Sequence, residues 1–169
     1  MSRRRRVALG LIALLAAVVI AFFLNPDPRL RASRLVRSRL LGLASALSFK
    51  ENDPSLVRLT YPARLAAFFA ERTEADITLG ARSAHQSVTR SEIESAAAGL
   101  RASNRGLSVQ FFDIVVTPDL ERGRAEAHLT ARVFFLGDQD YLVQEFRLGL
   151  VKAEGTWRVH RMATVPTME

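Results

Sequence analysis

The chain has 169 residues, no cysteine and a net charge of +7 at pH 7. Without cysteine, disulfides, thiolate catalysis and cysteine-ligated metal sites are excluded. The charge is unevenly placed: residues 1–39 hold nine arginines and one aspartate, whereas residues 40–169 hold 15 basic and 16 acidic side chains. The part of the chain after the N-terminal segment therefore has no basic excess, and we expect no nucleic-acid partner.

Residues 7–24 form an uninterrupted apolar run, VALGLIALLAAVVIAFFL. A helix of this length rises about 27 Å, close to the thickness of a bilayer core, so the run predicts a single transmembrane anchor. A cleaved signal peptide is the alternative, because residues 2–6 resemble its basic n-region. We favour the uncleaved anchor because the run is longer than a usual h-region. The arginines of residues 3–6 also suggest a twin-arginine export signal, but the rest of that motif matches poorly.

Arginines flank this run on both sides. We favour a cytoplasmic N-terminus, with residues 1–6 as a basic tail, because these charges adjoin the run directly. The rest of the protein then lies outside the cytoplasm, in the periplasm of a bacterium, behind a single-pass anchor in the inner (cytoplasmic) membrane. The flanking arginines are expected to meet lipid phosphates of the bilayer, unless they only form a solvated helix face. They are Arg3, Arg4, Arg5, Arg6, Arg29, Arg31 and Arg34.

Residues 25–49 are expected to be a juxtamembrane linker followed by an amphipathic helix. Two prolines at positions 26 and 28 break the membrane helix. Between residues 29 and 47, apolar side chains recur at helical spacing, at Val36, Leu40, Leu43 and Leu47. Such a stripe predicts packing on the domain core rather than on the bilayer.

A second helical segment is predicted after residue 53. Asp53 is typical of an N-cap and Pro54 of a first helical residue. Pro62 interrupts the segment, so residues 55–72 form either one kinked helix or two short ones. The side chains expected to face inward are Leu65, Phe68 and Phe69.

A short strand is expected at residues 76–80, and the clearest helix start follows it. Thr89 and Glu92 match a capping box, in which each side chain satisfies a backbone donor. The stop of this helix is predicted at Gly106, which can adopt a left-handed conformation.

After Gly106 the apolar pattern changes from helical spacing to alternation, which is typical of strands. Turn-rich segments suited to antiparallel hairpins separate four strand candidates, at residues 107–117, 124–136, 141–152 and 156–165. The second is the clearest, because apolar and polar residues alternate strictly along it. Helices followed by hairpin strands predict an α+β domain with helices packed on a curved antiparallel sheet.

This order of elements ends in Gly155-Thr156-Trp157-Arg158-Val159 and resembles the NTF2-like (SnoaL-like, cystatin-like α+β) superfamily. In that superfamily the last strand often reads Gly-x-Trp-Arg/Lys-Val/Ile. The resemblance assigns residues 50–169 to an NTF2-like domain. It implies a cone-shaped cavity between sheet and helices, which members use for catalysis, ligand holding or protein docking. Fold alone does not choose among these uses.

An enzyme of this superfamily would need an acid or a base in that cavity. Asp113 interrupts an apolar strand face, and a carboxylate among phenylalanines can have a raised pKa and act as a base. If Arg161 pairs with it, Asp113 stays ionised and structural, and one bulge would turn it outward. The candidate pocket residues are Tyr61, Asp113, Gln144 and Arg161.

No other residues indicate catalysis or cofactor binding. His85, His128 and His160 are isolated, and the sequence has neither a metal-binding motif nor a phosphate-binding glycine loop. We therefore expect no metal and no cofactor. His128 and His160 are predicted on polar strand faces, and His85 in a polar loop.

Two functions remain. We favour a membrane-anchored, non-catalytic NTF2-like domain, exposed outside the cytoplasm, that binds a protein partner or forms a homo-oligomer during assembly. Type IV secretion inner-membrane assembly factors and proteins associated with mammalian-cell-entry transport have a similar plan of short tail, single span and exterior domain. The alternative is a SnoaL-like enzyme or a small apolar-ligand carrier that uses the cone-shaped cavity.

Overall fold

A computed structural model describes residues 27–79 and 82–165 of the chain. The chain divides into two units, residues 1–31 and residues 32–169. The predicted tail and anchor, residues 1–24, lie outside the described ranges. No helix within those ranges is long and apolar enough to cross a membrane.

Three helices are described: α2 (Pro28–Leu47), α3 (Ser55–Ala66) and α4 (Arg90–Ser103). The apolar stripe of α2 packs on the core as predicted, since Val36 and Leu40 are fully buried, Leu43 is 4% exposed and Leu47 is partly buried. The predicted capping box starts α4: Thr89 Oγ1 accepts from Glu92 N, and the Glu92 carboxylate accepts from Thr89 N at 2.7 Å. The prediction of these two helices is confirmed.

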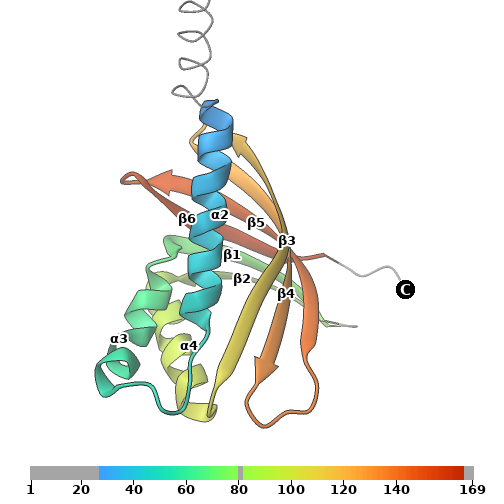
Figure 1. Ribbon diagram of the computed structural model, residues 1–169. Helices are drawn as coiled ribbons and strands as arrows, with labels where there is room; N and C mark the ends of the chain where they lie inside the picture. The colour runs from blue at the N-terminus through green and yellow to red at the C-terminus, as the bar shows by residue number, and fades with distance from the viewer. Residues whose placement is uncertain (1–26, 80–81, 166–169) are drawn as a thin grey trace, which may run out of the picture. The chain divides into compact units, whose positions relative to one another are not determined.

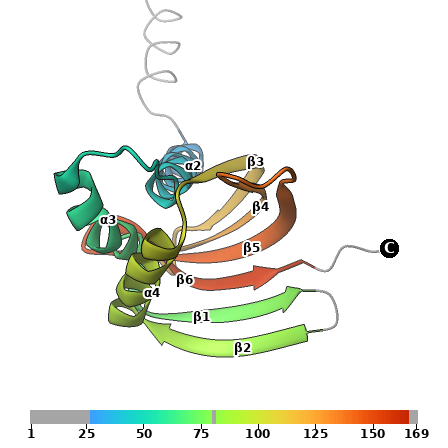
Figure 2. The ribbon, with the colours of Figure 1, turned by 90° about the horizontal axis from the view of Figure 1, so that it is seen from below.

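The described strands are β1 (Phe69–Leu79), β2 (Arg82–Thr89), β3 (Leu107–Asp119), β4 (Arg124–Phe135), β5 (Leu142–Ala153) and β6 (Thr156–Thr164). They form one sheet in the order β2-β1-β6-β5-β4-β3, in which β1 and β6 are parallel and every other pair is antiparallel. The sheet is curved, with the helices on one side of it (Figures 1 and 2). The predicted α+β class and the four strands after Gly106 are confirmed.

The two faces of the sheet differ in character. In β4, Ala125, Ala127 and Leu129 are at most 5% exposed and belong to the core shared with the helices. The alternate residues Glu126 and His128 are exposed on the other side. We call the first side the helix face and the second the open face. Removing the apolar side chains of the helix face from water stabilises the fold by roughly 25 cal/mol per Å².

The start of α3 differs from the prediction. The helix begins at Ser55, and Pro54 occupies the N-cap without a side-chain hydrogen bond. The carboxylate of Asp53 instead accepts from Lys50 N and from Arg101 Nη2, each at 3.0 Å. These two donors hold the carboxylate, so the predicted cap at Asp53 is wrong.

The end of α3 and the strands after it also differ from the prediction. Pro62 lies inside a single helix that ends at Ala66, and the chain enters β1 at Phe69. The predicted strand at residues 76–80 is only the end of β1, and β2 is missed entirely. Residues 83–87 of β2 are all exposed on the edge of the sheet, so no apolar alternation marks this strand.

The stop of α4 differs in its mechanism. Its C-cap is Asn104 in an extended conformation, and Asn104 Nδ2 donates to Leu100 O at 2.8 Å. Gly106 does not adopt the predicted left-handed conformation. A Cβ at Gly106 would lie 3.1 Å from Leu136 Cβ, so close approach of the chain at this end of the sheet accounts for the glycine.

Candidate functional site

Tyr61, the first predicted pocket residue, is fully buried on α3. Its hydroxyl donates to Leu47 O at 3.1 Å, and its ring meets Phe49 edge-on with centroids 5.3 Å apart. The guanidinium carbon of Arg101 lies 5.1 Å from the Tyr61 ring centroid. Burial raises the pKa of the hydroxyl, which therefore stays protonated and acts as a donor. These contacts join α3 to the end of α2 and to α4.

Asp113 lies at a bulge in β3. The register between β3 and β4 shifts between Phe112 and Val115, and Asp113 has a φ of 51°, in the left-handed region. Its side chain is exposed, whereas Ile114 is 6% exposed and belongs to the core. The bulge therefore turns Asp113 away from the helix face, which is the alternative that the sequence leaves open.

Substitutions at Asp113 separate a catalytic carboxylate from a turn residue. Because asparagine tolerates the left-handed region, we expect Asp113→Asn to change the free energy of unfolding by less than about 0.5 kcal/mol. Asp113→Val is expected to cost about 1–3 kcal/mol, since a β-branched side chain is strained there. Chemical denaturation checks both variants, followed by the fluorescence of Trp157, the only tryptophan. Loss of a ligand or an activity in Asp113→Asn at unchanged stability would contradict the structural role.

Gln144 is half-buried on β5 and bonded to the backbone. Its Nε2 donates to Glu145 O at 3.1 Å and to Val165 O at 3.0 Å. Gln144 thereby ties β5 to the end of β6. Within residues 27–79 and 82–165, no hydrogen bond or ion pair joins any two of the four predicted pocket residues.

Arg161 follows a second bulge, in β6. Gly149 pairs with Arg161 and Leu150 with Val159, so His160 is an extra residue in the strand. A Cβ at Gly149 would lie 3.3 Å from Arg161 Cβ, which places Arg161 on the open face with Gly149. The bulge reverses the parity that the sequence assigns to Arg161.

The ion-pair partner of Arg161 is Asp76 on β1, not Asp113. Arg161 Nη2 donates to Asp76 Oδ2 at 3.0 Å, and His85 Nδ1 bonds the other oxygen of the same carboxylate. The His85 bond, followed by the Arg161 bond, holds the pKa of Asp76 below its usual value. Asp76 is not among the site residues predicted from the sequence. Asp76 lies opposite His85 in the pairing of β1 with β2, so this contact could have been predicted only if β2 had been predicted.

The remaining histidines also lie on the open face. His128 Nε2 bonds Glu126 Oε1 at 2.8 Å, as strand alternation predicts. His160 is half-buried, and burial, together with the charge of Arg124, lowers the pKa of its imidazole. Among the residues that the structure describes, no three metal-ligating side chains gather into a group that could hold an ion.

The interior between the sheet and the helices is apolar. Of the described residues, only Thr73 and Thr164 are polar and buried, and their hydroxyls donate to Val159 O and Thr78 O. The buried Trp157 Nε1 has no partner there. No aspartate, glutamate, histidine or lysine of the described ranges is buried, so Tyr61 is the titratable side chain of this interior.

The arginines of α2 fall into two groups. Arg29, Arg31 and Arg34 are exposed, whereas Arg3 to Arg6 lie outside the described residues. Arg37 Nη1 donates to Ile114 O at 3.3 Å. Arg39 donates to Trp157 O at 3.1 Å and to Ala67 O at 2.8 Å, and burial lowers its pKa. Arg37 and Arg39 therefore stabilise the fold, and Arg29, Arg31 and Arg34 remain candidates for lipid contact.

An exposed aromatic and apolar surface lies on the open face of β3, β4 and β5. The Arg132 guanidinium carbon is 4.8 Å from the Phe112 ring centroid and 5.2 Å from that of Tyr141. Val143 pairs with Arg132 across the strands. Phe112, Tyr141 and Val143 are 38%, 62% and 51% exposed. We call Phe112, Arg132, Tyr141 and Val143 the sheet patch. Exposed apolar clusters mark interaction sites, and arginine and tyrosine are enriched at their energetic centres.

The curved six-stranded sheet with helices on one face defines the NTF2-like, cystatin-like α+β fold. The chain is similar to a protein provisionally named a scytalone dehydratase from Novosphingobium aromaticivorans, with 19% identity, a TM-score of 0.62 and coverage of 82% of this chain and 86% of that chain. It is also similar to an NTF2-like protein of unknown function from Pseudomonas putida, with 14% identity, a TM-score of 0.57 and coverage of 82% and 89%.

A third similar structure is a domain of unknown function with a cystatin-like fold from Nostoc punctiforme, with 13% identity, a TM-score of 0.56 and coverage of 86% and 81%. No protein-family model and no curated protein matches the sequence. At these identities the likeness establishes the fold and leaves the activity open.

Proposed function

We propose that the chain is a membrane-anchored, non-catalytic NTF2-like domain that docks a protein on its open face, outside the cytoplasm. The sheet patch is the observation that carries this proposal. Its aromatic and aliphatic side chains face solvent, and the Arg132 guanidinium contacts both rings, at 4.8 and 5.2 Å from their centroids. Such a cluster is what a protein interface buries at its centre.

Residues 27–79 and 82–165 contain no convergent catalytic set, and this supports the binding role. Asp113 and Arg161 are both turned away from the helix face by bulges, and Gln144 is held by backbone carbonyls. Acid–base catalysis needs a titratable group within hydrogen-bond reach of a substrate in a protected site. The alternative, an enzyme or ligand carrier, draws support from the dehydratase name of one similar structure.

Site-specific photo-crosslinking tests the docking surface in the full chain, expressed in its own membrane. A benzophenone amino acid at Val143 is expected to give one discrete adduct, whose partner mass spectrometry identifies. The combined Arg132→Ala and Tyr141→Ala substitutions should reduce that adduct at least about tenfold, because truncating hot-spot residues costs 2 kcal/mol or more. The same probe at Glu121, in the turn after β3, is the control position. Adducts of equal yield at both positions, insensitive to the substitutions, would refute the docking role.

Residues 7–24 carry the proposed tether, and the lack of cysteine makes its orientation simple to measure. A single cysteine introduced at Glu121 should react with a membrane-impermeant maleimide in intact cells, whereas one at Ser2 should react only after lysis. Deleting residues 7–24 should release the protein from membranes washed at alkaline pH. The reverse labelling pattern would overturn the proposed orientation, and a soluble full chain would overturn the tether.

A further inference from the structure

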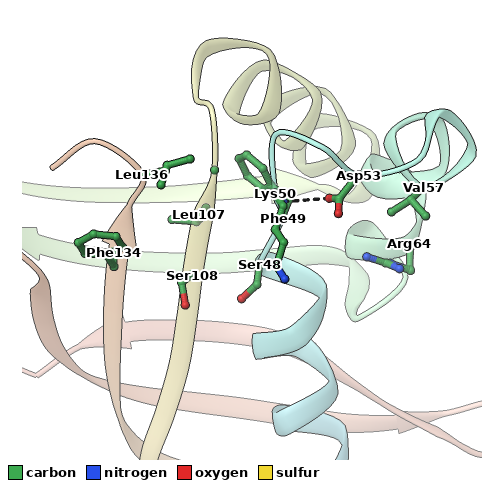
Figure 3. A pocket seen from close by; sticks show the side chains of 11 residues that line it. Ser48, Phe49, Lys50, Asp53, Val57, Arg64, Leu107, Ser108, Phe134 and Leu136 are labelled. Carbon is green, nitrogen blue, oxygen red and sulfur yellow. Dashed lines mark hydrogen bonds between the residues drawn. The ribbon is translucent and has the colours of Figure 1, made fainter.

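A cavity of about 500 Å³ lies at the edge of the sheet, where β3 begins. Phe49 and Leu107 line it and are joined by two backbone hydrogen bonds of 2.8 and 2.9 Å. Leu107, Phe134 and Leu136 lie on one side, and Val57 and Arg64 of α3 on the other (Figure 3). None of the four predicted pocket residues lines it. It is therefore distinct from the interior that the fold resemblance implies.

One wall of this cavity is apolar and accessible to solvent. Phe134 is 37% exposed and Leu136 is 54% exposed, whereas Leu107 is 6% exposed and belongs to the core. Two hydroxyl groups, of Ser48 and Ser108, also line the cavity. A concave apolar wall with a few polar groups is the usual construction of a small-molecule site, and about 500 Å³ lies within the usual range of volumes.

Two cationic side chains, Lys50 and Arg64, also line the cavity. Within the described ranges, the Lys50 ammonium and the Arg64 guanidinium make no hydrogen bond and no ion pair. Asp53, the carboxylate of the cavity, is already bound by Arg101 Nη2 and by the backbone N–H of Lys50, as Figure 3 shows for the latter. An adjoining cavity shares Lys50 and adds Arg58 and the ion pair of Arg105 with Glu51.

We propose that this cavity binds an anionic amphiphile, with a carboxylate or phosphate headgroup on an aliphatic chain. Lys50 and Arg64 would bind the headgroup, since guanidinium and ammonium groups form strong charge-assisted bonds with such anions. The chain would lie on Phe134 and Leu136, which removes their exposed area from water. This proposal goes beyond the docking role and does not depend on it, because no residue of the sheet patch takes part.

The test uses the full chain in phosphatidylcholine nanodiscs, with octyl phosphate and octanoate as probes in isothermal titration calorimetry. Saturable one-to-one binding above that of empty discs is expected. Octyltrimethylammonium should not saturate, because its charge is reversed. The combined Lys50→Gln and Arg64→Gln substitutions should weaken binding at least about tenfold. The matched control, Lys152→Gln with Arg122→Gln, lies at the opposite end of the β3–β4 hairpin and should bind like the original chain.

Two further arms keep the proposal open to refutation. Inorganic phosphate should bind at least about tenfold more weakly than octyl phosphate, and Leu136→Ser should weaken octyl phosphate but not inorganic phosphate. Equal affinity for both phosphates, or equal loss in the charge variant and its control, would overturn the proposal. Adding phosphatidylglycerol to the discs distinguishes a membrane lipid from a soluble amphiphile as the natural ligand. Competition with octyl phosphate would indicate a membrane lipid, and no competition a soluble amphiphile; either result keeps the ligand class. The fluorescence of Trp157 shows that each variant is folded.

Discussion

Replacing Tyr61 by alanine is expected to destabilise the domain by about 3–5 kcal/mol, the cost of deleting a buried aromatic ring. The ring is fully buried and contacts both the Phe49 ring and the guanidinium of Arg101, so its removal leaves a cavity in the core. Tyr61→Phe keeps the ring and removes only the hydroxyl that donates to Leu47 O. This variant is expected to cost about 1 kcal/mol.

Urea denaturation followed by Trp157 fluorescence measures both variants, and Tyr141→Ala is the matched control. Tyr141 is the only other tyrosine and is 62% exposed, so its truncation should change the free energy of unfolding by less than about 0.5 kcal/mol. A neutral Tyr61→Ala would contradict the structural role. So would a Tyr61→Phe variant that loses a ligand at unchanged stability, because that result would make the hydroxyl a pocket group.

The strands after Gly106 were predictable because each buries one face against helices. Alternation along β4 marks that burial directly, and Gly155 and Glu154, with φ of 75° and 52°, form the short turn expected before β6. β2 lacks such a signal. Residues 83–87 are exposed on both faces at the edge of the sheet, so nothing in their composition separates a strand from a loop.

The candidate site was less predictable, because strand parity fails wherever a bulge inserts a residue. Asp113 and Arg161 were chosen for their positions on apolar faces. A bulge at Asp113 and an extra residue at His160 turn both to the open face. The sequence alone does not reveal either bulge. The partner of Arg161, Asp76, depends on the unpredicted pairing of β1 with β6.

Asp53→Asn is expected to destabilise the domain by about 2 kcal/mol, the scale of a hydrogen bond to a charged group. The Arg101 side chain is 10% exposed, its Nη2 donates to this carboxylate at 3.0 Å and to Lys50 O at 3.4 Å, and its Nη1 has no hydrogen-bond partner among the described residues. The guanidinium is held over Phe49 and Tyr61, so a shift of Arg101 would also loosen the contact of α4 with α3. Removing one member of a largely buried pair leaves the other charge uncompensated.

The pH dependence of stability gives this pair a signature of its own. The backbone N–H of Lys50, followed by Arg101, holds the pKa of Asp53 below its usual value in the folded state. The stabilisation is therefore complete above the unfolded-state pKa, near 4, and is lost as the pH falls through the lower folded-state value. Urea denaturation at stepped pH should show the original chain losing stability there and Asp53→Asn losing less. The control is Glu51→Gln, which removes the exposed pair with Arg105 and should cost less than about 0.5 kcal/mol. If Asp53→Asn and Glu51→Gln lowered the free energy of unfolding equally, the burial of Arg101 would not strengthen its ion pair with Asp53.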